Sequence, residues 1–195
     1  MMQTREDLRK YLAADAVLYE KVSTGILKRL KNRIFTNPIN TQYIIYKYVV
    51  LLRHAEYHMY NSMLFESKGL KVMMHTVALA WYYWRLRKVS YKTGFQIPPG
   101  VCGPGLQIWH YGSIVINESV RIGANVTLYP GVEIGEKNGG YPSIGDNCFI
   151  GAGAKIFGGI SVGNNVVVAP NAVVVKDVPD NAIVGGVPAR ILRYK

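Results

Sequence analysis

The second half of the chain repeats aliphatic residues at an interval of six, and this period constrains the fold more than any other feature. A period of six belongs neither to an α-helix nor to a simple alternating strand, whereas a short strand followed by a corner produces it. Three such sides make a triangular coil with the aliphatic side chains in a shared interior column. The ten positions are Ile116, Ile122, Leu128, Ile134, Ile144, Ile150, Ile156, Val162, Val168 and Val174.

The residues around these ten positions support the same coil. A small or apolar residue stands two positions before most of them, for example Val120 and Ala154, and glycine follows five of them directly. One step is ten residues long, from Ile134 to Ile144, and the segment "EKNGGY" within it supplies glycines for a loop that leaves the coil. Successive coils are expected to stack with strands about 4.8 Å apart.

The sequence pattern of the first half of the chain predicts helices. Thr4 and Asp7 have the spacing of a capping box ahead of an apolar run, so a first helix is expected to begin there. The pair Asn37-Pro38 is a turn signal.

Two further helices are expected, from about Ile39 to Tyr60 and from just after Gly69 to Gly94, which suits a helix C-terminus. One apolar face of the last helix is expected to pack internally, with contact to a membrane surface as the alternative. This face consists of Met73, Val77, Ala80, Trp81 and Trp84.

Charge divides the chain at the same place as the patterning. Residues 1–96 hold 16 Lys and Arg and 6 Asp and Glu, a net +10, whereas residues 97–195 hold 7 and 6, a net +1. We therefore expect an α-helical N-terminal unit over 1–96 and a β domain with a short C-terminal tail over 97–195. The basic half suits anionic lipid, an acidic or phosphorylated substrate or nucleic acid, and it equally suits a solvated helical surface.

Other sequence features exclude several protein classes. The two cysteines have no metal-ligand spacing, and the N-terminal stretch "MMQTREDLRKYL" lacks the apolar core of a signal peptide. The longest apolar run, Val72 to Trp84, has 13 residues, fewer than the roughly 20 that span a bilayer. We expect a cytoplasmic protein, with peripheral contact at the inner face of a membrane as an extension.

The stretches "HYGSIVIN", "IGDNCFIGAGAKIFGGISVG", "NAVVVKDVP" and "GVPARI" resemble the hexapeptide-repeat acyltransferases. The branch that they resemble most contains the serine O-acetyltransferases and relatives that acetylate surface polysaccharides. The resemblance covers about half the chain and implies a left-handed parallel β-helix, so the fold class is α+β, mainly β. It also implies acetyl-CoA as cosubstrate, no metal, and a homotrimer with the active site between neighbouring β-helices.

His110 is the only histidine after residue 75, and it matches the catalytic histidine of that family. Acetyl transfer needs a base that removes the acceptor hydroxyl proton, and a neutral imidazole, with an unperturbed pKa of about 6.5, suits that role. His110 is therefore predicted to be the general base, against the alternative of a buried structural histidine. Glu118 and Glu133 are two candidates for an orienting acid, and the sequence does not choose between them.

The chain departs from the serine enzymes where those hold their substrate. An aspartate precedes the histidine in the serine enzymes, but Trp109 stands here, and Gln96 replaces a second, upstream aspartate. Their loop carries Arg-His-Pro, where this chain has Gly140, Tyr141 and Pro142. We therefore favour an uncharged acceptor, a sugar hydroxyl of a surface glycan or its precursor stacking on Trp109 or Tyr141. Serine O-acetylation is the alternative.

The resemblance also implies the residues that contact coenzyme A. Small residues of the repeats would lie against pantetheine, and basic residues near the C-terminus would meet the phosphates or the adenine end. The implied cofactor contacts are Gly135, Ala152, Ala169, Pro170, Lys176, Arg190 and Arg193.

The sequence gives less support to other functions. His54 and His58 are four apart on an expected helix, but "HAEYH" lacks the H-E-x-x-H pattern and a third ligand. No P-loop or dinucleotide fingerprint is present, and no nucleic-acid partner is expected. A non-catalytic β-helix scaffold, with the basic helices as its working surface, is the remaining alternative.

Overall fold

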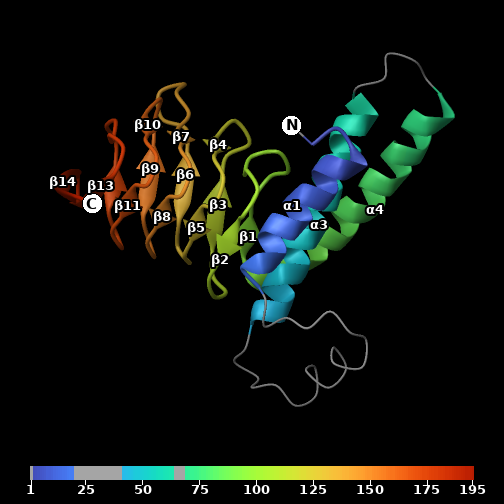
Figure 1. The fold of residues 1–195 in the computed structure, drawn as a ribbon, viewed down its shortest axis with the longest axis horizontal. Helices are drawn as coiled ribbons and strands as arrows, with labels where there is room; N and C mark the ends of the chain where they lie inside the picture. The colour runs from blue at the N-terminus through green and yellow to red at the C-terminus, as the bar shows by residue number, and fades with distance from the viewer. Residues whose placement is uncertain (1, 20–40, 64–68) are drawn as a thin grey trace.

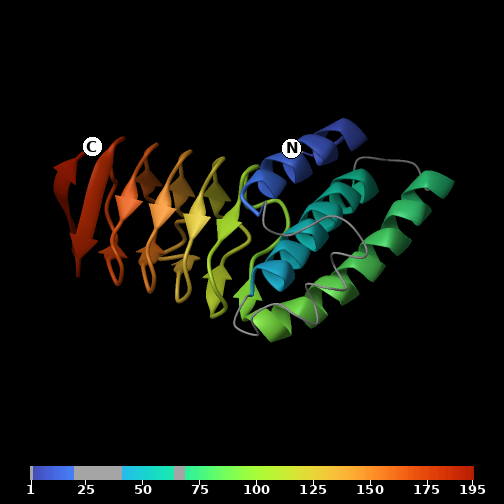
Figure 2. The same ribbon diagram turned by 60° about the horizontal axis from the view of Figure 1, so that its bottom comes forward.

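The protein is described here by a computed structural model that covers residues 2–19, 41–63 and 69–195. Within these ranges, three helices precede the strands: α1 (Arg5–Val17), α3 (Gln42–Met63) and α4 (Leu70–Thr93). Helix α3 lies between α1 and α4, and the strands extend away from the three helices as a stack of coils (Figure 1). Figure 2 shows the same stack from below, with the C-terminus at the end far from the helices.

Three sheets form the sides of the stack, and every pairing between successive coils is parallel. Sheet A contains β1 (Phe95–Gln96), β3 (Ile114–Ile116), β6 (Glu133–Gly135), β9 (Lys155–Phe157) and β12 (Val173–Val174). Sheet B contains β4 (Arg121–Ile122), β7 (Ser143–Ile144) and β10 (Ser161–Val162). Sheet C contains β2 (Gln107–Ile108), β5 (Thr127–Leu128), β8 (Phe149–Ile150), β11 (Val167–Val168), β13 (Ala182–Gly186) and, antiparallel at its end, β14 (Ala189–Tyr194).

The chain passes from sheet A to sheet B to sheet C and back, so each turn of the coil has an A–B corner, a B–C corner and a C–A corner. All ten positions of the six-residue repeat are buried. Repeat positions of adjacent coils pair with each other in the strand register, for example Ile116 with Ile134 and Leu128 with Ile150. The predicted left-handed β-helix with an aliphatic interior column is therefore confirmed.

The helix boundaries follow the expected signals in the described ranges. The Asp7 N–H donates to Thr4 Oγ1 at 3.0 Å and the Thr4 N–H donates to Asp7 Oδ2 at 2.8 Å, which confirms the capping box. Gly94 ends α4 in the left-handed conformation, with φ of 82°. Helix α3 ends at Met63, slightly beyond the expected Tyr60. The Asn37-Pro38 turn and the expected start at Ile39 lie outside the described residues.

The prediction that one apolar face of α4 packs internally is wrong. Met73, Val77, Trp81 and Trp84 are between 46% and 66% exposed. Helix α4 is apolar on two faces, so the sequence period alone did not identify the face that packs. The side chains that pack toward the core are instead Leu79, Tyr82, Tyr83, Leu86 and Val89.

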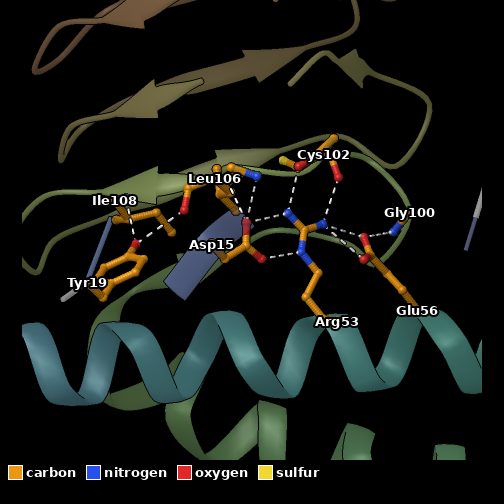
Figure 3. A network of polar contacts seen from close by, with 10 residues as sticks. Asp15, Tyr19, Arg53, Glu56, Gly100, Cys102, Leu106 and Ile108 are labelled. Atoms are coloured by element: carbon orange, nitrogen blue, oxygen red, sulfur yellow. Dashed lines mark hydrogen bonds and ion pairs between the residues drawn. The ribbon is translucent and has the colours of Figure 1, made fainter. Parts of the chain in front are cut away.

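A buried polar network joins the helices to the first coil (Figure 3). Arg53 of α3 donates to Asp15 at 2.7 Å, to Glu56 at 3.0 Å and to the carbonyl oxygens of Cys102 and Gly103 at 2.8 and 2.6 Å. The three charged side chains are almost fully buried. Burial by itself would lower the pKa of Arg53, but the neighbouring carboxylates raise it above its ordinary value, so the guanidinium stays charged.

The same helices satisfy backbone N–H groups of the first coil. Asp15 accepts from the N–H groups of Gly105 and Leu106 at 2.8 and 2.9 Å, and Glu56 accepts from that of Gly100 at 2.7 Å. The Tyr19 hydroxyl accepts from the Ile108 N–H at 2.9 Å. In the described part of the chain no coil precedes this one, and an unpaired buried backbone group is costly, so these side chains act in place of a preceding coil.

No helix in the described ranges is long and apolar enough to cross a bilayer.

Candidate active site

His110 lies at the C–A corner of the first complete coil, between β2 and β3, and its side chain is exposed. Its backbone is left-handed, with φ of 62°. Six other non-glycine residues in the described part of the chain have positive φ, and all six are asparagines at turns. A histidine in this conformation is uncommon, and such local backbone strain gathers at functional sites. The alternative of a buried structural histidine does not fit an exposed ring.

The corner that carries His110 is two residues longer than those stacked on it. Eight residues separate the paired positions Ile108 and Ile116, whereas six separate Leu128 from Ile134 in the next coil. Backbone hydrogen bonds fix this longer corner to the segments on both sides of it. The Gly112 N–H donates to Thr93 O at 3.1 Å, and the Gly131 N–H donates to the carbonyl oxygen of Ser113 at 2.6 Å. The expansion carries the imidazole out of the regular coil.

Two aromatic side chains lie near the imidazole of His110. The ring centroids of Trp109 and His110 lie 6.2 Å apart, and Tyr129 of the next coil lies 6.5 Å from His110 and stacks with Trp109 at 6.2 Å. Trp109 and Tyr111 are 37% and 41% exposed. Tyr129 was not among the residues expected in the site. The sequence feature that could have identified Tyr129 is the eight-residue step from Ile108 to Ile116, just before the regular repeat. With that step counted, residue 129 stacks on Trp109 in the adjacent coil.

Three of the expected cofactor contacts lie along the same corner. The positions following sheet C stack in register, because the N–H of each donates to a carbonyl oxygen in the next strand of sheet C. The donors are Trp109, Tyr129, Gly151 and Ala169, and the acceptors are Leu128, Ile150, Val168 and Val184. This column changes from aromatic to small: Trp109, Tyr129, Gly151, Ala169. Beside it runs a second column, His110, Pro130, Ala152 and Pro170.

The small residues of this corner leave a surface without bulk. A side chain added at Gly151 would place its Cβ 2.7 Å from Pro170 N, so the backbones of neighbouring coils are in contact there. Ala152 and Ala169 are half-buried and Pro170 is exposed. No bulky side chain therefore stands at these positions of the corner.

The other expected residues divide between the A–B corner and the last strand. Gly135 ends β6 and packs on Phe157, exposed Tyr141 follows the loop that turns between Lys137 and Gly140, and exposed Lys176 follows β12. Within one chain these residues and Trp109 are on different corners, so Trp109 and Tyr141 do not form one stacking platform.

Arg190 and Arg193 are exposed on β14, which caps sheet C. Arg190 pairs with Gly185 in the strand register. Gly185 in turn lies against Ala169, because a Cβ added to Gly185 would be 3.2 Å from the Cβ of Ala169. Arg190 is therefore at the C-terminal end of the corner that begins at His110.

Neither candidate orienting acid contacts His110 in the described part of the chain. Glu133 forms an ion pair with Lys155 at 2.5 Å, and the Lys155 Nζ also donates to Gly131 O at 3.0 Å. Glu118 is exposed at the A–B corner beyond β3.

The two thiols are not suited to nucleophilic chemistry. Both cysteines are buried, and burial raises the pKa of Cys102 to about 12 and also raises that of Cys148. No group of three or more His, Cys, Asp or Glu side chains in the described ranges is arranged to hold a metal ion.

Comparison with known proteins agrees with the geometry of the coils. A family model described as the hexapeptide repeat of succinyl-transferase matches residues 142–176. The serine acetyltransferase of Staphylococcus xylosus is 43% identical over 106 residues, which are 52% of this chain and 49% of that protein. The chain thus matches about half the length of this curated relative.

Solved structures match over nearly the whole chain. The crystal structure of serine acetyltransferase from Brucella abortus strain S19 has a TM-score of 0.62 and 26% identity, over 96% of this chain and 68% of that one. The soybean serine acetyltransferase complexed with serine has a TM-score of 0.64 and 25% identity, over 95% and 69%. The chain is therefore a left-handed β-helix protein of hexapeptide repeats with an N-terminal helical unit, and it resembles the serine acetyltransferases.

Proposed function

We propose that the protein is an acetyl-CoA-dependent O-acetyltransferase in which His110 is the general base. The single observation that carries the proposal is an exposed imidazole with left-handed backbone, on an expanded corner continuous with a run of small residues. The identity to serine acetyltransferases lies in about half of the chain and supports the same chemistry.

The proposed reaction is direct transfer. As the acceptor oxygen attacks the thioester carbonyl, His110 takes the hydroxyl proton, the new C–O bond forms and the C–S bond breaks. The proton then passes from His110 to the departing thiolate, so the imidazole is neutral again at the end. A base placed in this way contributes roughly 10²- to 10⁴-fold to the rate.

The proposed cofactor path follows the C–A corner. Pantetheine would lie along Ala152, Ala169 and Pro170, with the cations of Arg190 and Arg193 near its phosphate end. Gly135 and Lys176, on the A–B corner, would contribute from a neighbouring chain, which is why we propose a homotrimer with each site between two β-helices.

L-Serine is the first candidate acceptor, because the relatives and the solved structures carry serine acetyltransferase names. This acceptor replaces the sugar that the sequence favoured, since the comparisons give no support to a glycan. One observation keeps a sugar hydroxyl as second candidate. The position before His110 holds exposed, aromatic Trp109, which stacks with Tyr129, and carbohydrate rings pack well on such surfaces.

The test is the rate of thiol release from acetyl-CoA with L-serine and then with a panel of sugars. His110→Asn is the informative variant, because asparagine already occupies the other left-handed non-glycine positions, whereas alanine would add backbone strain. His75→Asn, in the helical unit, is the matched control. We expect acceptor-dependent thiol release from the wild type and the control, and a loss of roughly 10²-fold or more in His110→Asn.

Serine-dependent release would establish the first candidate, and release with a sugar but not with serine would establish the second. Acceptor-dependent release that is undiminished in His110→Asn would contradict the assignment of the base. If the wild type releases no thiol with any of these acceptors, the scaffold reading replaces the enzyme.

A further inference from the structure

Helix α4 presents an apolar surface that nothing in the described part of the chain covers. It is the outermost helix, on the far side of α3 from α1 (Figures 1 and 2). We define the α4 outer face as Met73, Met74, Val77, Trp81 and Trp84, all of which are exposed. A shallow hollow of about 500 Å³ lies on this face and is lined by Met73, Met74, Val77, Ala78, Trp81 and Tyr82.

The charges of the same helix are all positive. Helix α4 contains Lys71, Arg85, Arg87, Lys88 and Lys92, and it contains no aspartate or glutamate. Two of these cations are held against the apolar face, since the Arg85 guanidinium lies 4.7 Å from the Trp81 ring centroid and Lys88 Nζ lies 3.6 Å from that of Trp84. Two cations and two tryptophans therefore lie together on one surface.

This combination decides between two kinds of partner. A second copy of the chain on the same face would bring Arg85 and Lys88 of each α4 toward the same cations of the other, and α4 has no carboxylate that could pair with them. An anionic lipid surface complements the charge, because each Lys or Arg near such a surface is attracted to it. Tryptophan side chains favour the boundary between headgroups and acyl chains, where the apolar ring and the indole N–H are both accommodated.

We propose that the α4 outer face binds the surface of a membrane that contains anionic lipids. The helix lies in the plane of the headgroups, with Trp81, Trp84 and the methionines inserted and Arg85 and Lys88 at the level of the phosphates. The whole helix of 24 residues is about 36 Å long, and the α4 outer face occupies part of that length. This binding is independent of the acetyl-transfer reaction, because the face lies on the helical unit and His110 lies on the β-helix.

The test is co-sedimentation of the full chain with vesicles, either phosphatidylcholine alone or phosphatidylcholine with phosphatidylglycerol. The paired variants are Trp81→Ser with Trp84→Ser, and Arg85→Gln with Lys88→Gln. Their controls are Val17→Ser and Arg9→Gln, which change exposed side chains of α1. Circular dichroism and thermal unfolding of every variant establish that the helices remain folded.

We expect the wild type and both controls to bind the anionic vesicles, with binding that weakens as salt is added. Each paired variant should lose about tenfold or more of its partition coefficient. Equal binding to the neutral and the anionic vesicles, or no binding to either, would overturn the proposal. A wild-type mass in light scattering that rises with concentration and falls in the tryptophan pair, without vesicle binding, would show instead that the face joins two copies.

Discussion

The helical unit and the β-helix bury different kinds of side chain, and the difference shows what each region does for the other. The interior column of the β-helix is aliphatic, and its backbone groups pair from coil to coil. The charged residues that are buried in the described part of the chain are Asp15, Arg53 and Glu56, all from the helices. A middle coil finds its hydrogen-bond partners in its neighbours, whereas the first coil finds them in helical side chains. The helical unit is thus the N-terminal cap of the repeat.

The largest effect on stability is expected from Arg53→Met, which breaks this cap. The change leaves the Asp15 and Glu56 carboxylates buried without their cation and removes the donors to Cys102 O and Gly103 O. Breaking a buried ion pair on one side costs about 3–5 kcal/mol in the free energy of unfolding. Urea unfolding, followed by circular dichroism, measures this change in the free energy of unfolding.

Arg9→Met is the control, because Arg9 is exposed on α1, and its free energy of unfolding should change by no more than about 0.5 kcal/mol. Equal stabilities for the Arg53 and Arg9 variants would show that the first coil does not depend on the helices.

A somewhat smaller loss is expected from Ile150→Ala, which opens a cavity in the aliphatic column. Ile150 is fully buried between Leu128 and Val168, and such a truncation costs about 2–5 kcal/mol. Ile191→Ala on β14 is the matched control, since Ile191 is 46% exposed. Chemical unfolding of the two variants tests whether the column is as tightly packed as its burial indicates, and losses of equal size would contradict it.

The smallest effect is a pH dependence that belongs to the helical unit alone. His58 Nδ1 lies 3.0 Å from His75 Nδ1, and burial, with added repulsion from the charges of His75 and His54, lowers the pKa of His58 to about 4. A pKa lowered on folding gives a stability contribution that is complete above the unfolded value of about 6.5 and is lost as the pH falls toward 4.

The measurement is the thermal midpoint of the wild type and of His58→Gln between pH 7.5 and 4.5. The difference in midpoint between the two proteins should narrow as the pH falls. A difference that does not change with pH would show that His58 has the same pKa in the folded and unfolded chain.

Repetition explains how much of the fold could be predicted from the sequence. The aliphatic residue of the hexad recurs at ten positions, so the coil, its interior column and the loop after Ile134 follow from the spacing alone. The ends of the helices followed from local chemistry at Thr4 and Gly94. The Arg53 network could not be predicted in this way, because its partners lie 38 and about 50 residues away and no periodic pattern brings them together.

The sequence identified residues of the candidate site better than it identified their arrangement in space. His110 stood out as an isolated histidine beside a regular repeat, but its left-handed backbone and the longer corner emerge only from the strand register. The sequence did not show which corner each expected residue occupies, and the order of the sheets places Gly135 and Tyr141 on another corner than Trp109 of the same chain. The packed face of α4 could not be chosen from its sequence, because both of its faces are apolar.

The most direct test of the central claim is to measure turnover and coenzyme A affinity of His110→Asn side by side. The wild type and His75→Asn serve as references. If the base acts on a cofactor held by the C–A corner, kcat falls by roughly 10²-fold or more while the Kd for coenzyme A from calorimetry stays within about twofold of the wild type. An unchanged kcat, or a loss of affinity that accounts for the whole loss of activity, would contradict the assignment of His110 as the general base.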